Sequence, residues 1–301
     1  MKKFAYSFFI FTAIVLIFEI GVIVYQITAK QNAVKEFFTF DDQYQYLFLG
    51  DSHIGCSIMP SKDLKTKVYW QSGCHPVLSL FKLMEIERLG NLKNVKYCII
   101  EFGYQTESSM NYCSLNSIYY SNFSYSWRYF SKMPWNTWLA VDELLRKNAM
   151  GKPSNSPLSE TTLPLTERTR AFVDKQVANV IPQHFDYINN PSPDMVKEYR
   201  KKLENTFLEI NDICRRNGVK LIVISAPLSS WYRKEVPAEA ELIKKNWIKW
   251  MGLNQISYLD MTESMPDSSF VESHHLLSIA REDFTKKLLD RINECTFTSD
   301  N

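Results

Sequence analysis

The stretch Tyr44-Gln45-Tyr46-Leu47-Phe48-Leu49, followed directly by Gly50-Asp51-Ser52-His53, decides the fold of this chain. Its first part is a short apolar run, typical of a strand buried inside a sheet, and Gly50 marks a sharp turn at its end. Ligand sites of open parallel sheets form at the carboxyl ends of strands. We therefore expect Ser52 to be exposed where a site can form.

Outward from this stretch, strand-like and helix-like segments alternate. The expected strands cover residues 68–70, 95–102, 220–225 and 256–259, and the expected helices cover 76–89, 192–217, 238–251 and 278–294. Gly218 follows the second of these helices, where a glycine commonly ends a helix. The alternation predicts an α/β fold, a three-layer sandwich in which helices cover both faces of a mostly parallel sheet.

Composition narrows the class of protein. With 301 residues, 45% hydrophobic and 23% charged, the chain can bury one or two ordinary cores. Nine glycines and twelve prolines are too few for a fibrous or linker-dominated protein. The 35 basic and 33 acidic side chains nearly balance, and no basic block occurs, which argues against a nucleic-acid partner.

The amino terminus has the pattern of a membrane anchor. Residues 4–25 are apolar or small except for Glu19, a length that matches a bilayer span and exceeds the core of a cleaved signal peptide. Lys2 and Lys3 favour a cytoplasmic amino end. We expect a signal anchor at residues 1–30, a linker at 31–43 and an extracytoplasmic domain, periplasmic or at the cell surface. Glu19 either contacts water in the outer half of the span or pairs with a partner membrane helix.

The expected domain covers residues 44–301 and contains an aromatic-rich insertion at about 106–191. We expect this insertion to pack on the sheet or the membrane surface, with stacking on sugar rings or covering of the site as alternatives. All six cysteines follow the anchor, where an oxidising compartment permits disulfides of unknown pairing. Cys98 lies in an apolar strand, where a buried thiol is expected. The sequence contains no CxxC pair, so a cysteine zinc site or a thioredoxin-type site is not favoured.

Ser52 needs partners if it is to act as a nucleophile. A histidine must accept its proton, and a carboxylate must orient that histidine. Glu272 precedes His275 by three residues, just ahead of the last expected helix, so one turn can present both. The predicted triad is Ser52, Glu272 and His275. A shift of one residue would give His274 the role of the base, and Asp267 is the reserve candidate for the acid.

On these residues the chain resembles the SGNH/GDSL hydrolase family, named for its Ser, Gly, Asn and His blocks. The four blocks correspond to Gly50-Asp51-Ser52, Gln71-Ser72-Gly73, Gly103-Tyr104-Gln105-Thr106 and Glu272-Ser273-His274-His275-Leu276. The resemblance implies a flavodoxin-like sheet and an oxyanion hole formed by Ser52, Gly73 and Gln105. It covers residues 44–294 but skips the insertion.

Two positions depart from the family pattern. Gln105 replaces the asparagine of the third block, and the added methylene moves the amide by about 1 Å, a displacement that can lower a rate on the order of a hundredfold. Glu272 replaces aspartate, which is milder because either carboxylate can orient an imidazole. The α/β-hydrolase elbow fits less well, because Ile54 stands where its second glycine would be.

The same residues also have structural interpretations. Ser52 can cap a helix after the turn, as serine and aspartate often do, and Asp51 and Asp267 are plausible turn formers. His53 is expected at the rim of the site or in packing rather than as a second base. His274 is expected to be an exposed neighbour of His275, and His75 and His184 to be surface or loop histidines, because no partner stands near them in sequence.

The resulting hypothesis is a membrane-anchored, extracytoplasmic serine esterase or O-acyltransferase that acts on acylated cell-envelope glycans through an acyl-serine. The glycan is implied by the resemblance and by no residue pattern. We expect no cofactor, no metal and no nucleic-acid partner, and a membrane-bound acyltransferase is a candidate partner. The alternative is a catalytically inactive accessory protein that supports such an acyltransferase or binds surface polysaccharide.

Overall fold

The computed structural model describes residues 35–70, 76–108, 177–188 and 193–297, together with short pieces at 6, 10–14, 17 and 175. Residues 71–75, which include Gly73 of the predicted second block, lie outside the described residues. So do His75, Cys74, Cys113 and most of the aromatic insertion.

Five parallel strands form one sheet in the order β2-β1-β3-β4-β5. The strands are β1 (Tyr46–Gly50), β2 (Thr66–Trp70), β3 (Tyr97–Glu101), β4 (Lys220–Ser225) and β5 (Ser257–Asp260). This is the flavodoxin-like order, in which the chain reverses direction across the sheet between β1 and β3. The predicted α/β fold with a parallel sheet is confirmed, and the five expected strands are displaced by only one or two residues.

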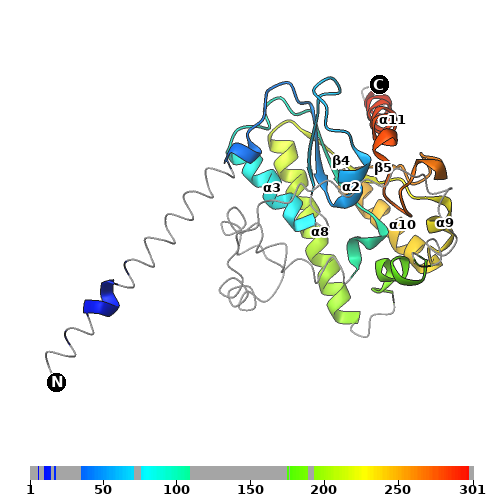
Figure 1. The fold of residues 1–301 in the computed structure, drawn as a ribbon, viewed down its shortest axis with the longest axis horizontal. Coiled ribbons are helices and arrows are strands. Elements are labelled where there is room, and N and C mark those ends of the chain that lie inside the picture. Colours follow the sequence, from blue (N-terminus) through cyan, green and yellow to red (C-terminus); the bar gives the residue numbers. More distant parts are fainter. Residues whose placement is uncertain are drawn as a thin grey trace.

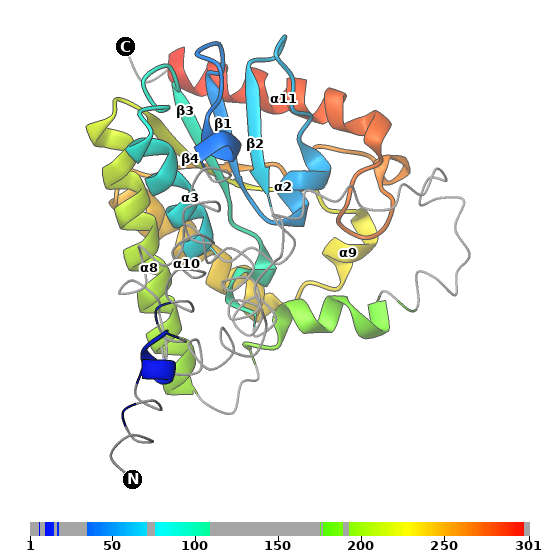
Figure 2. The same ribbon diagram turned by 60° about the vertical axis from the view of Figure 1, so that its left-hand side comes forward.

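Helices cover both faces of the sheet, as Figures 1 and 2 show. They are α2 (Ser52–Ser57), α3 (Pro76–Arg88), α8 (Pro193–Arg216), α9 (Ser230–Lys234), α10 (Ala238–Leu253) and α11 (Ser278–Phe297). Three 3-10 turns add η1 (Tyr104–Glu107), η4 (Ile181–Phe185) and η5 (Asp267–Ser269). At the short α2 the sequence predicts a turn, with a capped helix as the alternative.

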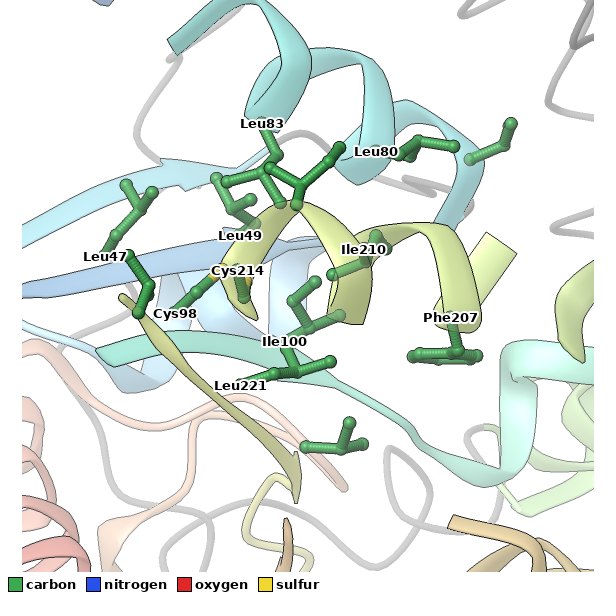
Figure 3. Close-up of a cluster of buried hydrophobic side chains, with 14 of the residues drawn as sticks. Leu47, Leu49, Leu80, Leu83, Cys98, Ile100, Phe207, Ile210, Cys214 and Leu221 are labelled. Atoms are coloured by element: carbon green, nitrogen blue, oxygen red, sulfur yellow. The ribbon is translucent and has the colours of Figure 1, made fainter. Parts of the chain in front are cut away.

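Alternate residues of each strand feed two separate cores. Leu47, Leu49, Cys98 and Ile100 face α3 and α8, and Figure 3 shows them packed against Leu80, Leu83, Phe207, Ile210 and Cys214. Phe48, Ile99, Ile222 and Ile224 face the opposite side and pack with α11. Each fully buried aliphatic or aromatic side chain stabilises the fold by about 1.5–3 kcal/mol. Burial on both faces explains why the strands read as unbroken apolar runs.

Helix α8 ends as its sequence predicts. Gly218 has φ +69°, a left-handed conformation that glycine adopts without strain. The Val219 N–H donates to the Cys214 carbonyl at 2.9 Å, which satisfies one of the last helical carbonyls. The turn then leads directly into β4.

Three of the six cysteines lie among the described side chains. Cys56, Cys98 and Cys214 are all buried free thiols. The predicted buried thiol at Cys98 is therefore confirmed, and Figure 3 places it beside Cys214.

The pieces described near the amino terminus are helical, and Tyr6, Phe11, Ile14 and Ile17 are exposed. None of the helices in the described part of the chain combines the length and apolar content needed to cross a bilayer. Most of the predicted anchor, including Glu19, lies outside the described residues.

The end of the predicted insertion packs against the domain. Ile181 and Phe185 of η4 form a small buried cluster with Tyr104, Leu228, Tyr232 and Ala240. This contact fixes η4 beside the carboxyl end of the sheet, and it brings His184 close to the predicted site.

Candidate active site

The turn after β1 places Ser52 at the first position of α2. Asp51 is the N-cap of this helix, and its side chain accepts a hydrogen bond from the His53 backbone N–H at 2.7 Å. Gly50 is required before it, because a Cβ there would overlap the side chain of Ile54. The capping role proposed as an alternative thus belongs to Asp51, and Ser52 keeps its hydroxyl for other partners.

Glu272 and His275 come from a tight loop that leads into α11. An antiparallel bridge between Phe270 and Leu276 closes this loop, and the Val271 N–H donates to the His275 carbonyl at 2.8 Å. The closure holds both side chains on one side of the loop, which passes beside α2 (Figure 2).

The three predicted triad residues meet. His275 Nε2 lies 3.0 Å from Ser52 Oγ, and His275 Nδ1 contacts Glu272 Oε1. The contact to a carboxylate fixes the tautomer with the proton on Nδ1, so that Nε2 presents its lone pair to the serine. The side chains of His275 and Glu272 are 13% and 23% exposed, so both are partly accessible from the surface.

A buried polar network lies next to Ser52. His53 Nδ1 is 2.7 Å from Glu101 Oε1, and both side chains are buried. The Gln105 amide Nε2 donates to Glu101 Oε1 at 2.9 Å and to Asp51 Oδ2 at 3.2 Å. Two members of the network, Asp51 and His53, are the immediate chain neighbours of Ser52, so the network fixes the nucleophile turn from both sides.

The network shifts the pKa of each ionisable member. Burial disfavours the charged form of His53, but the carboxylates of Glu101 and Asp51 outweigh it and raise the pKa of His53 to about 9. Burial and the charge of Asp51 raise the pKa of Glu101 to about 8. The pKa of Asp51 stays below its usual range, because the charge of His53 and the hydrogen bonds outweigh the effect of burial. These shifts favour a protonated His53 beside the carboxyl groups of Asp51 and Glu101.

Two further histidines lie next to this network. His274 is buried and its Nδ1 is 2.6 Å from Ser273 Oγ, and its ring centroid is 4.2 Å from that of His275. His184 is also buried, with Nδ1 2.8 Å from Tyr232 Oη. Burial lowers the pKa of His184 to about 3 and that of His274 well below its usual value. Both rings are neutral imidazoles.

Several predictions from sequence are corrected here. His274 is buried rather than exposed, and His184 is a buried neighbour of the site rather than a surface residue, because η4 folds back onto Tyr232. His53 is a buried ion-pair partner. Asp267 accepts a hydrogen bond from the Ser230 backbone N–H at 2.7 Å. Its carboxylate therefore stabilises the start of α9 and is not the acid of the triad.

The roles of two predicted oxyanion-hole residues, Gly73 and Gln105, are not tested by this geometry. Gly73 lies outside the described residues. Gln105 is buried with its amide nitrogen engaged by Asp51 and Glu101, and its role as an oxyanion donor stays a prediction. The backbone N–H of Ser52 is at the first position of α2, where a helix leaves its N–H groups without intrahelical acceptors.

Glu101 is the functional residue that sequence reasoning missed. It is the last residue of β3, a charged residue at the carboxyl end of an apolar strand that pairs with β1. That position alone was a usable signal, because carboxyl ends of neighbouring parallel strands meet at one edge. His184 carried no comparable signal, since its place depends on how residues 177–188 fold back.

Comparison with known proteins identifies similar folds. No family model matches the chain, and no curated protein matches it. Among solved structures, the chain is similar to a Bacteroides fragilis protein described as an acylhydrolase, with 8% identity, TM-score 0.38 and coverage of 85% of this chain and 89% of that one. It is also similar to a GDSL-like lipase from Bacteroides thetaiotaomicron, with 9% identity, TM-score 0.40 and coverage of 86% and 91%. At these identities and scores, the assignment of function depends on the geometry of this chain's own site.

Proposed function

We propose that this protein is a serine esterase or O-acyltransferase of the SGNH/GDSL type. One observation carries the proposal: His275 Nε2 lies 3.0 Å from Ser52 Oγ while its Nδ1 contacts Glu272. A hydroxyl, an imidazole and a carboxylate in this order form the arrangement that activates serine in acyl transfer.

The geometry supports a two-step reaction. Ser52 Oγ attacks the ester carbonyl carbon, and His275 Nε2 takes the hydroxyl proton while Glu272 stabilises the imidazolium. The tetrahedral intermediate then breaks its bond to the alcohol oxygen, which receives the proton from His275. The acyl group remains on Ser52 as an ester. Water or a sugar hydroxyl next gives its proton to His275 and attacks the acyl carbon. The bond from the acyl carbon to Ser52 Oγ then breaks, Oγ takes the proton back from His275, and an acid or a new ester is released.

The developing oxyanion needs hydrogen-bond donors. The Ser52 backbone N–H at the start of α2 is one candidate, and the Gly73 N–H and the Gln105 amide are the others predicted from sequence. Each good donor of this kind contributes about 2.7–4 kcal/mol of transition-state stabilisation.

The substrate and the location belong to the proposal as well. We propose acylated cell-envelope glycans as substrates and attachment to the membrane by residues 1–30, with the domain on the extracytoplasmic side. The apolar run at 4–25 and the exposed Phe11, Ile14 and Ile17 support the anchor. A reporter enzyme fused after Asn301 tests the topology, because a fusion that is active only in the cytoplasm contradicts it.

The decisive test of catalysis uses the full chain in detergent, a fluorophosphonate probe and a chromogenic acetyl ester. We expect the wild type to be labelled and to hydrolyse the ester, and Ser52→Ala to do neither. Ser57→Ala is the matched control, because Ser57 lies on the same short helix, is buried and has no hydrogen-bond partner for its hydroxyl among the described residues. Labelling that survives in Ser52→Ala, or is absent from the wild type, contradicts the enzyme and favours the accessory protein.

A further inference from the structure

Three imidazoles converge beside the nucleophile. His53 comes from α2, and His274 and His275 come from the loop before α11. One ring nitrogen of each lies within 4.8 Å of the others. Their ring centroids are 4.7 Å apart for His53 and His274, 4.2 Å for His274 and His275, and 5.5 Å for His53 and His275.

In each ring the Nδ1 atom already has a partner. His53 Nδ1 is held by Glu101, His275 Nδ1 by Glu272, and His274 Nδ1 by Ser273 Oγ. Nε2 is therefore the nitrogen that each ring can offer to a metal. Histidines that bind metals generally place their second nitrogen against a carboxylate, a carbonyl or a hydroxyl, which orients the ring and makes it a stronger ligand.

We propose that His53, His274 and His275 form a binding site for a divalent transition-metal ion, zinc in particular, and that occupancy of this site blocks catalysis. Three imidazole nitrogens with a fourth position left for water match the coordination that zinc accepts. The carboxylates of Glu101, Glu272 and Asp51 lie around the three rings and compensate the charge of the ion.

The geometry requires only a small adjustment. Zinc–nitrogen bonds of about 2.0–2.1 Å in a tetrahedral arrangement place the nitrogens about 3.4 Å apart. One nitrogen of each ring now lies within 4.8 Å of the others, and we expect rotation of the rings to bring the nitrogens to the shorter separation. Protons compete with the ion for the same nitrogens, so binding strengthens as pH rises.

Inhibition follows from a shared lone pair. His275 Nε2 is the atom that faces Ser52 Oγ and accepts its proton. The same lone pair is needed to coordinate the metal, so an occupied site leaves the serine without its base. This part of the inference rests on the proposed function, whereas metal binding itself does not.

The test measures zinc binding and catalysis separately, on the full chain in detergent and without a polyhistidine tag. Isothermal titration with zinc chloride is expected to give one ion per wild-type chain, and Ser52→Ala is expected to bind it equally well. His274→Gln removes one ligand outside the triad and is expected to weaken binding at least about a hundredfold.

His184→Gln is the matched control. His184 is the fourth buried histidine of the cluster, 5.2 Å from His274 between ring centroids, but it is not one of the three converging ligands. Its replacement is expected to leave zinc affinity close to that of the wild type, because His184 Nδ1 contacts Tyr232 Oη and orients none of the three proposed ligands. If His274→Gln does not melt cooperatively, Ser273→Ala replaces it, since loss of the hydroxyl that orients His274 is expected to weaken binding about tenfold.

The catalytic readout is fluorophosphonate labelling with and without zinc. We expect zinc to suppress labelling of the wild type, a chelator to restore it, and His274→Gln to be labelled equally in both conditions. Absence of zinc binding to the wild type, or equal affinity in His274→Gln, overturns the site. Zinc binding to a wild type that is never labelled retains the site and instead rejects the enzyme function.

Discussion

His275 Nε2 lies 3.0 Å from Ser52 Oγ, although 223 residues separate the two in the chain. The contact joins α2, the helix that follows β1, to the loop before α11. Its direction is set by Glu272, which contacts the other ring nitrogen. The reactivity of Ser52 therefore depends on a carboxylate that does not touch it.

Replacement of Glu272 by glutamine tests that dependence. The amide cannot stabilise the imidazolium and favours the wrong tautomer, so kcat for a chromogenic acetyl ester is expected to fall on the order of a thousandfold to ten-thousandfold. Glu272→Asp is expected to retain much more activity, because a carboxylate is kept. Glu263→Gln is the control, since Glu263 is exposed and pairs with Arg233. A kcat for Glu272→Gln within tenfold of the wild type rejects this role.

Stability is expected to fall between about pH 4.5 and pH 9, through Glu101 alone at first and through both Glu101 and His53 above about pH 6.5. The pKa of His53 is raised to about 9 and that of Glu101 to about 8, so the folded state keeps two protons that the unfolded chain releases at lower pH. A raised folded pKa gives stability that is complete below the unfolded pKa and is lost as pH rises through the folded value. The melting temperature is expected to drop across this range.

Glu101→Gln separates this effect from general alkaline loss of stability. The variant cannot release the Glu101 proton, and it removes one of the charges that hold the proton on His53, so its melting temperature is expected to change less between pH 6.5 and pH 9. Glu282→Gln on the exposed face of α11 should follow the wild-type slope. Identical slopes in Glu101→Gln and the wild type would show that this network does not take up the protons.

Gly55→Ala is expected to destabilise the protein. A Cβ at Gly55 would overlap the indole ring of Trp70, which packs on α2 from the end of β2. Overpacking of this kind costs about 1–3 kcal/mol. In α10, Gly252→Ala is the control, because a Cβ there meets nothing within 4 Å and alanine favours a helix by about 0.5–1 kcal/mol. Urea unfolding of both variants measures the difference, and equal midpoints would contradict the close packing of α2.

Gly103→Ala is expected to displace Gln105. A Cβ at Gly103 would overlap the Gln105 amide, which donates to Asp51 and Glu101. Loss of these donors in a buried network costs about 1–3 kcal/mol. The double variant Gly103→Ala/Gln105→Ala should be less destabilised than the sum of the single variants, because the overlap disappears with the long side chain. Simple additivity of the two free energies of unfolding would show that the glycine is not needed for Gln105.

Much of the fold followed from local patterns. The apolar runs of β1, β3 and β4 could be assigned to buried parallel strands because both faces of these strands are covered. The end of α8 could be predicted from Gly218. The short α2 could not be foreseen, since six residues carry too little periodicity to distinguish a helix from a turn.

The candidate site could likewise be predicted only in part. Ser52, Glu272 and His275 are adjacent to recognisable turns, so their approach could be predicted from chain order and sheet topology. The burial of His184 and His274 became visible only with the fold, and Glu101 had only its position at the end of β3 as a signal. Burial and pairing across distant segments give these residues their charge states. Local sequence carries no information on the partner that will face a side chain.

The separation of Ser52 and His275 along the chain also has a consequence in time. The ribosome releases the α2 segment long before the loop that carries His275, because the two lie 223 positions apart in the chain. A growing polypeptide therefore exposes an unactivated hydroxyl throughout translation and gains its proton acceptor only when the last helix docks. Products truncated before His275 are expected to be inert rather than partly active, because Ser52 then has no base.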